Sequence, residues 1–445
     1  MSAAVDGCVQ PTGPGLPGTE SRALVVQKFG GSSLATPDHV RRVACRIAQD
    51  RAAGRRLVIV VSAMGDATDE LLESLRVLNP RAPAREVDML LATGEQVSIA
   101  LLASALWALG CPAVSLTGWQ AGVRTDRVHR KAQIAAMQPS RVLRELEAGR
   151  VVIVAGFQGL SPDGEITTLG RGGSDTTAVA LAAALGAYEC EIYSDVDGVY
   201  TADPRVVRSA RRISIISYDE MMEMAHLGAQ VLQIRAVECA LVNDVTIIAR
   251  STFTAGPGTR ITEVGAVEDH SLARAVAHDR HVARLALCGV PDRPGVAHRL
   301  FAALAHQHIN VDMIIQSQSR NGKNDIAFTV GSDELPHAEE TARGVGRELG
   351  AEAVLAEDGY GKVSLIGAGM ASNPGVAAGM FAALADAGVN IEMISTSEIK
   401  ISCLLRREVV DTAVRAVHDA FNLGRESPLP GSTRAGGAVS AQGRG

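Results

Sequence analysis

The chain has 445 residues, of which 47% are hydrophobic and 21% are charged, and its formal net charge at pH 7 is −6. A chain of this length is expected to form more than one hydrophobic core, because single domains usually contain about 100–200 residues. The weakly acidic charge gives no attraction to nucleic acid or to an anionic membrane, and only 3% of the residues are aromatic and could stack on single-stranded nucleic acid. We therefore expect a protein that acts on small molecules.

Both ends of the chain differ in composition from the rest. Residues 1–22 and 426–445 are rich in Pro, Gly, Ser and Thr, which is typical of a disordered leader and tail. No basic segment followed by an apolar run is present, and no stretch reaches the about 18 apolar residues that span a bilayer. The seven cysteines contain no C-x-x-C pair, which favours reduced thiols and a cytoplasmic location.

Between residues 24 and 252, apolar runs of strand length alternate with helical patterns rich in Ala and Leu. The runs are nearly continuous in Val, Ile and Leu, which is typical of parallel strands buried on both faces. This alternation predicts an αβα sandwich with a mostly parallel sheet, over residues 23–260. The expected strands are 24–30, 56–64, 112–118, 151–159, 190–195 and 245–251, and the expected helices include 96–110 and 176–187.

An internal repeat follows residue 260. Residues 283–317 parallel 362–397, since each copy has a strand, a loop with a Pro-Gly pair, a helix containing F-A-A-L-A, and a strand with N-[VI]-[DE]-M-I. Each copy continues with another strand, 325–330 or 399–405, and another helix. The order βαββαβ predicts two ferredoxin-like domains.

The second copy lacks a fourth strand, because only a polar tail follows its last helix at 409–423. The first copy has a candidate at 351–358, and a spare strand, 272–279, precedes it. Because a missing strand leaves a sheet edge unpaired, we expect 272–279 to complete the second copy. The expected domains are therefore 281–358 for the first copy and 272–280 with 361–424 for the second.

Two glycine-rich turns follow predicted strands. In the first, Gly30 and Gly31 allow backbone N–H groups to approach an anion, and Lys28 adds a mobile positive charge for phosphate oxygens. An ordinary strand–helix turn with a surface lysine is the alternative interpretation. Only five of the 43 basic residues are lysines, which favours a selected role for Lys28.

The second turn, residues 170–176, opens a helix that we expect to start near Thr176, with Ser174 or Asp175 as its N-cap. Capping does not explain Arg171, because an arginine between glycines is suited to hold a carboxylate through two parallel hydrogen bonds. Two anion-binding turns in one sheet fit a donor phosphate and an acceptor carboxylate.

Five segments in order resemble the aspartokinase branch of the amino-acid kinase family, and the repeated units resemble its paired ACT domains. The similarity extends from about residue 25 to 423. By contrast, the chain has no P-loop motif G-x-x-x-x-G-K-[ST] and no H-R-D or D-F-G of protein kinases. The five segments are QKFGGSSL (27–34), VVSAMGDATDEL (60–71), TGEQ (93–96), TLGRGGSDTTA (168–178) and SDVDGVYTADPR (194–205).

This resemblance implies ATP-dependent phosphorylation of the side-chain carboxylate of L-aspartate to 4-phospho-L-aspartate, with Mg²⁺ bound mainly through ATP and no separate metal site. The reaction begins the aspartate pathway to lysine, through diaminopimelate, and to threonine and methionine. Lys28 would bridge the transferring phosphate and Asp175 would orient it. The implied contacts with ATP are Lys28, Phe29, Gly30, Gly31, Ser62, Ser194, Asp195, Tyr200 and Arg205. Those with aspartate are Thr68, Glu95 (for its α-ammonium), Arg171 (for its α-carboxylate), Gly172, Gly173 and Ser174.

The chemistry of the reaction agrees with this residue set. A carboxylate nucleophile with a pKa near about 4 is already ionised at neutral pH, so no general base is required. Catalysis then depends on aligning two anions and neutralising the transferring phosphoryl group, which Lys, Arg and backbone N–H groups can do.

Three other functions fit parts of the sequence. A related kinase would act on acetylglutamate, glutamate or a nucleotide, and a non-catalytic sensor would bind amino acids without turnover. The segment SLIGAGMAS (364–372) suggests a dinucleotide oxidoreductase, but its third glycine position is Ser372 and too few residues follow for a Rossmann domain.

Three residues depart from the family pattern. Gln230 stands where a lysine often follows Gly-Ala, which leaves one phosphate contact in doubt. Arg130 stands where glycine is frequent, and Gln133 where arginine is frequent. These changes leave the reaction class intact and could alter affinity.

In the ACT resemblance, amino-acid effectors bind near the Pro-Gly turns and the strands that follow. We expect feedback inhibition by lysine, threonine or both, acting through a two-state interface in a homo-oligomer joined by these domains. A helix N-terminus suits the α-carboxylate, and Asp312 or Glu392 suits the α-ammonium. The implied effector residues are Asp292, Pro294, Gly295, Asn310, Asp312 and Gln316 in one copy, and Asn373, Pro374, Gly375, Asn390, Ile391 and Glu392 in the other.

Overall fold

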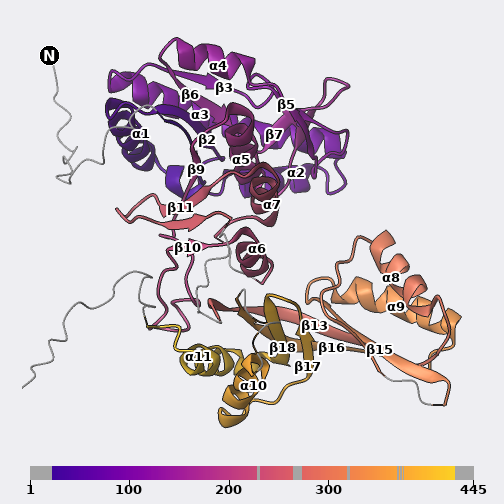
Figure 1. The fold of residues 1–445 in the computed structure, drawn as a ribbon. Helices are drawn as coiled ribbons and strands as arrows, with labels where there is room; N and C mark the ends of the chain where they lie inside the picture. Colours follow the sequence, from indigo (N-terminus) through magenta and orange to yellow (C-terminus); the bar gives the residue numbers. More distant parts are fainter. Residues whose placement is uncertain are drawn as a thin grey trace, which may run out of the picture. The chain divides into compact units, whose positions relative to one another are not determined.

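The computed structural model describes residues 23–227, 231–263, 273–317, 321–367, 370, 373 and 375–425. The expected leader and tail lie outside these residues, as do Gln230 and Pro374. The chain divides into two compact units, Met1–Tyr200 with Arg212–Val264 and Thr201–Arg211 with Gly265–Gly445 (Figure 1). Each unit is considered by itself below.

The first unit is built on an eight-stranded sheet with the strand order β10-β12-β11-β9-β1-β2-β6-β3. Neighbouring strands pair in parallel except β11 and β12, so the predicted mostly parallel sheet is confirmed. The strands are β1 (Leu24–Phe29), β2 (Arg56–Val61), β3 (Ala113–Leu116), β6 (Val151–Ala155), β9 (Glu189–Ser194), β10 (Ile215–Ile216), β11 (Ile247–Ser251) and β12 (Thr259–Ile261). Very short β10 and β12 were not expected, because so few residues give no periodic signal.

Helices cover both faces of this sheet (Figure 1). Alternate residues of β1 face opposite layers, and Val25 and Phe29 share one core with α1 (Pro37–Ala52) and α3 (Ala84–Ala108). Lys28, on the other face, meets α5 (Gly173–Leu185), beside which α7 (Ile234–Asn243) packs. The remaining helices of this unit are α2 (Ala67–Leu78), α4 (Ser140–Glu147), α6 (Tyr218–His226) and the short 3₁₀ helix η2 (Ser32–Leu34).

Helix α3 begins well before the predicted start at residue 96, because its helical pattern continues back through polar residues to Ala84. By length and composition alone α3 could cross a membrane. Its packing is that of a core helix, since it buries Leu102 and Leu106 completely and also encloses Asp88 and Glu95.

A second, four-stranded sheet has the order β5-β4-β7-β8 and was not predicted. Its strands are too short to be recognised by periodicity, namely β4 (Val123–Thr125), β5 (Ile134–Met137), β7 (Gln158–Leu160) and β8 (Ile166–Thr168). This sheet matters for the site because β8 ends at Thr168, directly before the second glycine-rich turn.

The helix after that turn starts earlier than predicted. Gly172, with a left-handed φ of 71°, is the N-cap of α5, and Ser174 and Asp175 lie within its first turn. The expected start near Thr176 and the expected capping role of Ser174 or Asp175 are therefore wrong. Gly173 continues the helix without a side chain, so no polar cap marks the true beginning in the sequence.

The second unit contains a six-stranded antiparallel sheet with the order β14-β15-β13-β16-β18-β17. Helices α8 and α9 lie over one end of it and α10 and α11 over the other (Figure 1). The elements are β13 (Ala275–Pro291), α8 (Val296–His306), β14 (Ile314–Gln316), β15 (Lys323–Gly331), α9 (Leu335–Leu349), β16 (Ala353–Ile366), α10 (Val376–Asp386), β17 (Met393–Thr396), β18 (Lys400–Arg406), η3 (Arg407–Val409) and α11 (Val410–Ala420).

Two long strands, β13 and β16, pass through both halves of this sheet. Ala275–Asp279 of β13 pair with Lys362–Ile366 of β16, and Arg284–Cys288 pair with Ala353–Glu357. The sequence indicated four separate strands here, because the polar residues 279–281 interrupt the apolar pattern of β13, and Gly359 and Gly361 interrupt that of β16. In the structure Gly359 has a φ of 91° and the ladder shifts register near Asp279, so the strands bend without ending.

A short excursion of the chain, Thr201–Arg211, belongs to this second unit. Ala202 and Val207 join the core formed by α10, α11 and their strands. The Thr201 hydroxyl lies 3.0 Å from Nε2 of the fully buried His418, and Val276 N–H donates to the Thr201 carbonyl. The segment that continues from β9 is thus fixed in the same core as α11.

The pairing of Ala275–Asp279 with β16 can be tested by Val276→Asp, because Val276 is 1% exposed in that core. Burying an unpaired charge should cost about 3 kcal/mol of unfolding free energy. Hydrogen exchange should accelerate in β18 and α11 much more than in β15 and α8. His281→Asp, an exposed position on β13, is the control, and equal acceleration in both halves would contradict the assignment.

Candidate active site

The candidate site lies where the carboxyl ends of neighbouring parallel strands meet. Ser62 N–H, after β2, donates to the Phe29 carbonyl at 3.1 Å, and Gly156 N–H, after β6, donates to Val61 at 3.0 Å. Gly30 N–H donates to the Tyr193 carbonyl of β9 at 3.2 Å. These bonds place the loops after four strands at one edge of the sheet, where α/β proteins commonly bind ligands.

Gly31 brings the first two motifs into contact. A Cβ at this position would lie 2.9 Å from the Ala63 carbonyl oxygen and 3.0 Å from that of Gly65. Gly65 N–H donates to the Gly31 carbonyl at 3.0 Å. Any side chain at Gly31 would separate these loops, so close backbone approach explains the glycine.

Lys28 and Asp175 form an ion pair, with Lys28 Nζ 2.6 Å from Asp175 Oδ1. Their side chains are only 12% and 9% exposed. The first turn of α5 favours the Asp175 carboxylate, because the positive end of the helix dipole lies there. The ammonium of Lys28 is therefore held at the end of β1 by the carboxylate of Asp175, which α5 keeps in place over that face of the sheet.

Glu95 is a buried carboxylate beside these loops, 3% exposed on α3. Its Oε1 accepts from Ala63 N–H at 3.1 Å, and its Oε2 has no hydrogen-bond partner among the residues that the structure describes. Burial raises the pKa of Glu95 to about 7. The free oxygen suits a ligand that brings a positive charge.

The second glycine-rich turn presents Arg171 to solvent, just before α5. Gly172 must be glycine here, since its φ is 71° and a Cβ would overlap the side chain of Gln233. Ser174 is buried and packs against Gly156, so it lies next to the loop after β6. Thr68 stands in the first turn of α2, after the loop of Ser62.

The residues expected to bind nucleotide are only partly brought together. Ser194 is the last residue of β9, the strand beside β1, and Asp195 follows it, while Tyr200 donates to Asp197 Oδ1 at 2.8 Å. The Phe29 ring is completely buried and stacks on Tyr193 with ring centroids 4.8 Å apart, so only its main chain can face a ligand. Arg205 belongs to the second unit, where its guanidinium binds Asp203.

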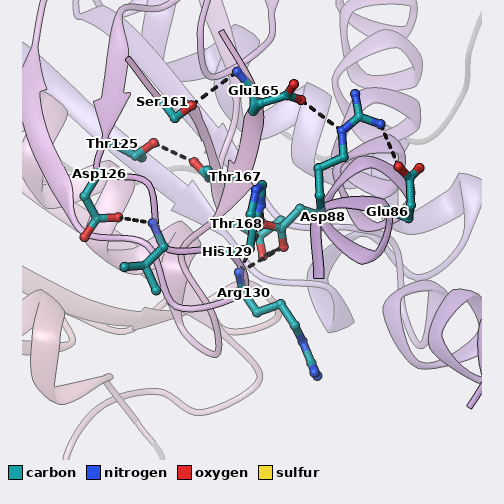
Figure 2. Close-up of polar contacts among 12 residues, drawn as sticks. Glu86, Asp88, Thr125, Asp126, His129, Arg130, Ser161, Glu165, Thr167 and Thr168 are labelled. Carbon is teal, nitrogen blue, oxygen red and sulfur yellow. Dashed lines mark hydrogen bonds and ion pairs between the residues drawn. The ribbon is translucent and has the colours of Figure 1, made fainter. Parts of the chain in front are cut away.

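A second polar cluster was missed by the sequence analysis. Asp88, on α3, is fully buried and bonded to His129, the Arg130 main chain and Thr168 (Figure 2). The available signal was a lone carboxylate in the apolar run VDMLLAT, seven positions before Glu95 and so on the same helix face. Two residues that depart from the family pattern lie in the same loop as His129. Arg130 has a left-handed φ of 67°, and Gln133 is exposed.

The expected effector residues lie at two corresponding places in the second unit. Asp292, Pro294, Gly295, Asn310 and Gln316 are all exposed, while Asp312 binds Lys362 of β16. In the other copy, Glu392 lies 3.4 Å from Arg284 and 3.8 Å from Arg406, between the half-buried Ile391 and β17. Gly295 and Gly375 are the left-handed N-caps of α8 and α10, while Asn373 is half-buried and Asn390 exposed.

Comparison with known proteins defines the class of protein. The chain matches the amino acid kinase family over residues 23–249, and ACT domains over 284–347 and 363–421. It is 51% identical over 409 residues to the aspartokinase of Mycolicibacterium smegmatis, covering 90% of this chain and 97% of that one. Its fold is similar to E. coli aspartokinase III in complex with aspartate and ADP (R-state), with a TM-score of 0.74 and 28% identity over 89% of this chain and 99% of the other. The same enzyme in complex with lysine and aspartate (T-state) gives a TM-score of 0.70 at 28% identity, with the same coverage.

Along the chain, these matches give an amino acid kinase domain followed by two ACT domains. The chain belongs to the aspartokinase family. The fold class and the family expected from the five motifs and the repeat are thereby confirmed.

Glu95 generates a prediction about stability. Its pKa is about 7 in the folded chain and about 4.5 when unfolded, so the folded state retains its proton longer as pH rises. Stability should therefore fall between these two pH values, and Glu95→Gln should remove that loss and gain on the order of 2 kcal/mol at pH 8. Chemical denaturation at pH 4.5 and 8 measures this, with exposed Glu86→Gln as control. If the Glu95→Gln variant is no more stable than wild type at pH 8, the burial of Glu95 does not raise its pKa as described.

Proposed function

We propose that the chain is an aspartate kinase, which transfers the γ-phosphoryl group of ATP to the side-chain carboxylate of L-aspartate. The observation that supports this most is the Lys28–Asp175 pair at the end of β1, where the neighbouring loop after β2 donates through Ala63 N–H to buried Glu95. Relatives at 51% identity are named aspartokinase, and the similar E. coli enzyme binds aspartate and ADP. The product, 4-phospho-L-aspartate, would feed the pathway to lysine, through diaminopimelate, and to threonine and methionine.

The substrate fits the charges of the site. In our proposal, the α-ammonium of aspartate pairs with Glu95 Oε2, whose burial makes an incoming cation favourable. Arg171 holds the α-carboxylate through its planar guanidinium, assisted by Gly172, Gly173, Ser174 and Thr68. With both α-groups held, the side-chain carboxylate is directed toward Lys28.

Phosphoryl transfer then needs no general base, since the attacking carboxylate is already ionised at neutral pH. Lys28 neutralises charge on the transferring phosphoryl group, and Asp175 keeps the ammonium at the strand end. In this proposal the backbone N–H of Gly31 is a further donor to phosphate, whereas Gly30, whose N–H is bonded to the Tyr193 carbonyl, lets the phosphate approach the turn closely.

The nucleotide would lie along Ser62, Ser194, Asp195, Tyr200 and the main chain of Phe29. Arg205, the remaining residue predicted to contact ATP, belongs to the second unit and stays a prediction. We propose Mg²⁺ as the partner of ATP, with the phosphate oxygens as its main ligands. Among the residues described, no three His, Cys, Asp or Glu side chains are grouped to hold a metal ion. Mg²⁺ would supply charge neutralisation at the β- and γ-phosphates.

Steady-state kinetics test the proposed roles. Wild type should consume ATP only with L-aspartate, and should turn over N-acetylglutamate or glutamate far more slowly. Arg171→Ala and Glu95→Gln should each raise the KM for aspartate at least tenfold, because each removes a hydrogen bond to a charged group. The KM for ATP should change little.

Lys28→Met should lower kcat by a factor of about 100 or more with aspartate binding retained, since its charge acts in the transition state. Lys28→Arg is the control for the buried charge of Asp175, which would otherwise be left unpaired. Absence of aspartate-dependent ATP consumption by the wild-type chain would exclude the proposed function and favour a sensor without catalysis.

We further propose that lysine, threonine or both inhibit the enzyme through the ACT domains. The E. coli relative binds lysine in its T-state structure. Within this chain, the family motif 194–205 crosses the boundary between the two units at Tyr200, and Thr201 is bonded to core residues of the second unit. A change in the ACT core that moves Thr201 can therefore move Tyr200, the residue before it in the nucleotide segment.

Asp312 and Glu392, the proposed ammonium partners, already bind basic side chains of the chain itself. An effector ammonium at Asp312 must therefore compete with Lys362, which is 4% exposed. The remaining proposed effector residues are Asp292, Pro294, Gly295, Asn310 and Gln316, and Asn373, Pro374, Gly375, Asn390 and Ile391.

Inhibition titrations test this regulation. Lysine or threonine should inhibit wild type, and Lys362→Met should lower the inhibitory concentration about tenfold, because the ammonium of Lys362 no longer competes for Asp312. The exposed pair of Lys323 with Glu352 provides the control Lys323→Met. If neither amino acid affects the activity of wild type, the regulatory proposal is refuted.

The division of the chain and its assembly complete the proposal. We propose a catalytic domain over 23–260, one ACT domain over 281–358 and another formed by 272–280 with 361–424, supported by the observed β13–β16 pairing. The open edge strands β14 and β17 expose Ile314 and Ile394, which supports a homo-oligomer joined through these sheets. A cytoplasmic location agrees with the free cysteines among the described residues.

A further inference from the structure

The polar cluster around Asp88 has no part in the substrate or nucleotide contacts of the proposed function. The carboxylate of Asp88 is 0% exposed and receives hydrogen bonds from three groups on two other segments (Figure 2). Thr168 Oγ1 donates at 2.6 Å, Arg130 N–H donates to both oxygens at 3.1 and 3.0 Å, and His129 Nδ1 lies at 2.7 Å. A carboxylate oxygen accepts, so Nδ1 of His129 is the donor and the tautomer of its ring is fixed.

This carboxylate is satisfied only when the two segments are in place. A buried carboxylate without donors is strongly unfavourable, so Asp88 stabilises the one arrangement in which His129, Arg130 and Thr168 all reach it. Asp88 itself is on α3, a long helix packed on the main sheet. The cluster therefore ties two short segments to a rigid element.

The tied segments hold the turn that presents Arg171. Ala132 N–H donates to the Thr168 carbonyl at 3.0 Å, and Arg235 donates to the Leu169 and Ala132 carbonyls at 2.6 and 2.9 Å. Thr168 is followed within three residues by Arg171. The loop of residues 126–133 and this turn are thus bonded to each other as well as to Asp88.

Their backbones also approach closely. A Cβ on Gly170 would lie 2.9 Å from the Arg130 carbonyl oxygen. Arg130 adopts a φ of 67°, a conformation that costs a residue with a side chain about 1–2 kcal/mol. The N–H of Arg130 donates to both oxygens of Asp88. The hydrogen bonds of the cluster therefore stabilise a backbone conformation that glycine would adopt without strain.

We propose that Asp88 is a positioning residue for substrate recognition, which sets the place of Arg171 through Thr168 and through the loop of His129 and Arg130. This inference rests on the proposed function, in which Arg171 holds the α-carboxylate of aspartate. Asp88 acts through these neighbours and does not touch the reacting atoms. Loss of the cluster should therefore weaken aspartate binding selectively.

The test compares two buried threonines in the same small sheet. Thr168→Val removes the donor to Asp88, whereas Thr125→Val removes the hydroxyl that lies 2.5 Å from Thr167 and has no bond to the cluster. Thr168→Val and Asp88→Asn should raise the KM for aspartate about tenfold while the KM for ATP changes less than about twofold. Thr125→Val should lower the Tm to a similar extent and leave both KM values unchanged.

Arg130→Gly provides a second comparison, because it keeps the N–H donor and removes the strained side chain. It should leave the KM for aspartate unchanged and should not lower the Tm, whereas Arg130→Ala retains the strain. An equal rise of both KM values in Thr168→Val, an equal effect of Thr125→Val, or an unchanged KM for aspartate in Asp88→Asn would each overturn the proposal.

Hydrogen exchange separates this proposal from the proposed function. In Asp88→Asn and Thr168→Val, amides of residues 126–133 and 169–173 should exchange faster than in wild type, whatever the substrate is. Unchanged exchange in both segments would refute the coupling even if the chain is an aspartate kinase. If exchange rises but wild type does not use aspartate, the cluster stands as a link to Arg171 and only the identity of the substrate is wrong.

Discussion

The ammonium of Lys28 and the carboxylate of Asp175 lie 2.6 Å apart at the edge of the main sheet, with little contact with water. Removing either charge alone would leave the other buried and unpaired, at a cost of about 3–5 kcal/mol, so each requires the other. The pair joins the end of β1 to the first turn of α5 and thereby fixes the distance between the two glycine-rich turns. In the proposed function, the binding of two anions next to each other depends on this arrangement, because a mobile lysine could not hold a phosphoryl group against a carboxylate.

Around that pair, the residues with free polar groups are arranged by main-chain contacts. Gly31 lies against the carbonyl groups of Ala63 and Gly65, and Ala63 in turn donates to Glu95. On the opposite side, Gly172 leaves room for Gln233 at the start of α5. The glycines are therefore required by close backbone approach, and one oxygen of Glu95 has no hydrogen-bond partner within the described part of the chain.

The sequence predicted the features that repeat or form long apolar runs. The buried strands beginning at Leu24, Arg56 and Val151 were recognisable because parallel strands covered on both faces are continuously apolar. The ferredoxin-like repeat was recognisable from its two F-A-A-L-A helices. The match of Lys28 with Asp175 required the family resemblance, since 147 positions separate them and no local pattern joins them.

Features that depend on tertiary contacts could not be predicted in this way. The N-cap at Gly172 has no polar side chain, so the helix start was placed too late. The four expected strands join into β13 and β16 because the ladder shifts register at Asp279 in one strand and bends at Gly359 in the other, and neither interruption ends the pairing. The cluster of Asp88 joins three segments that are distant in sequence, and only its unusual position in an apolar helix indicated a buried partner.

In the proposed reaction, the site directs the side-chain carboxylate of aspartate, and not its α-carboxylate, toward the phosphate held by Lys28. The acyl phosphate can be trapped with hydroxylamine, and NMR then identifies which hydroxamate has formed. We expect aspartate β-hydroxamate, formed only with ATP present and lost in Lys28→Met. Formation of the α-hydroxamate, or of no hydroxamate while ATP is consumed, would contradict it.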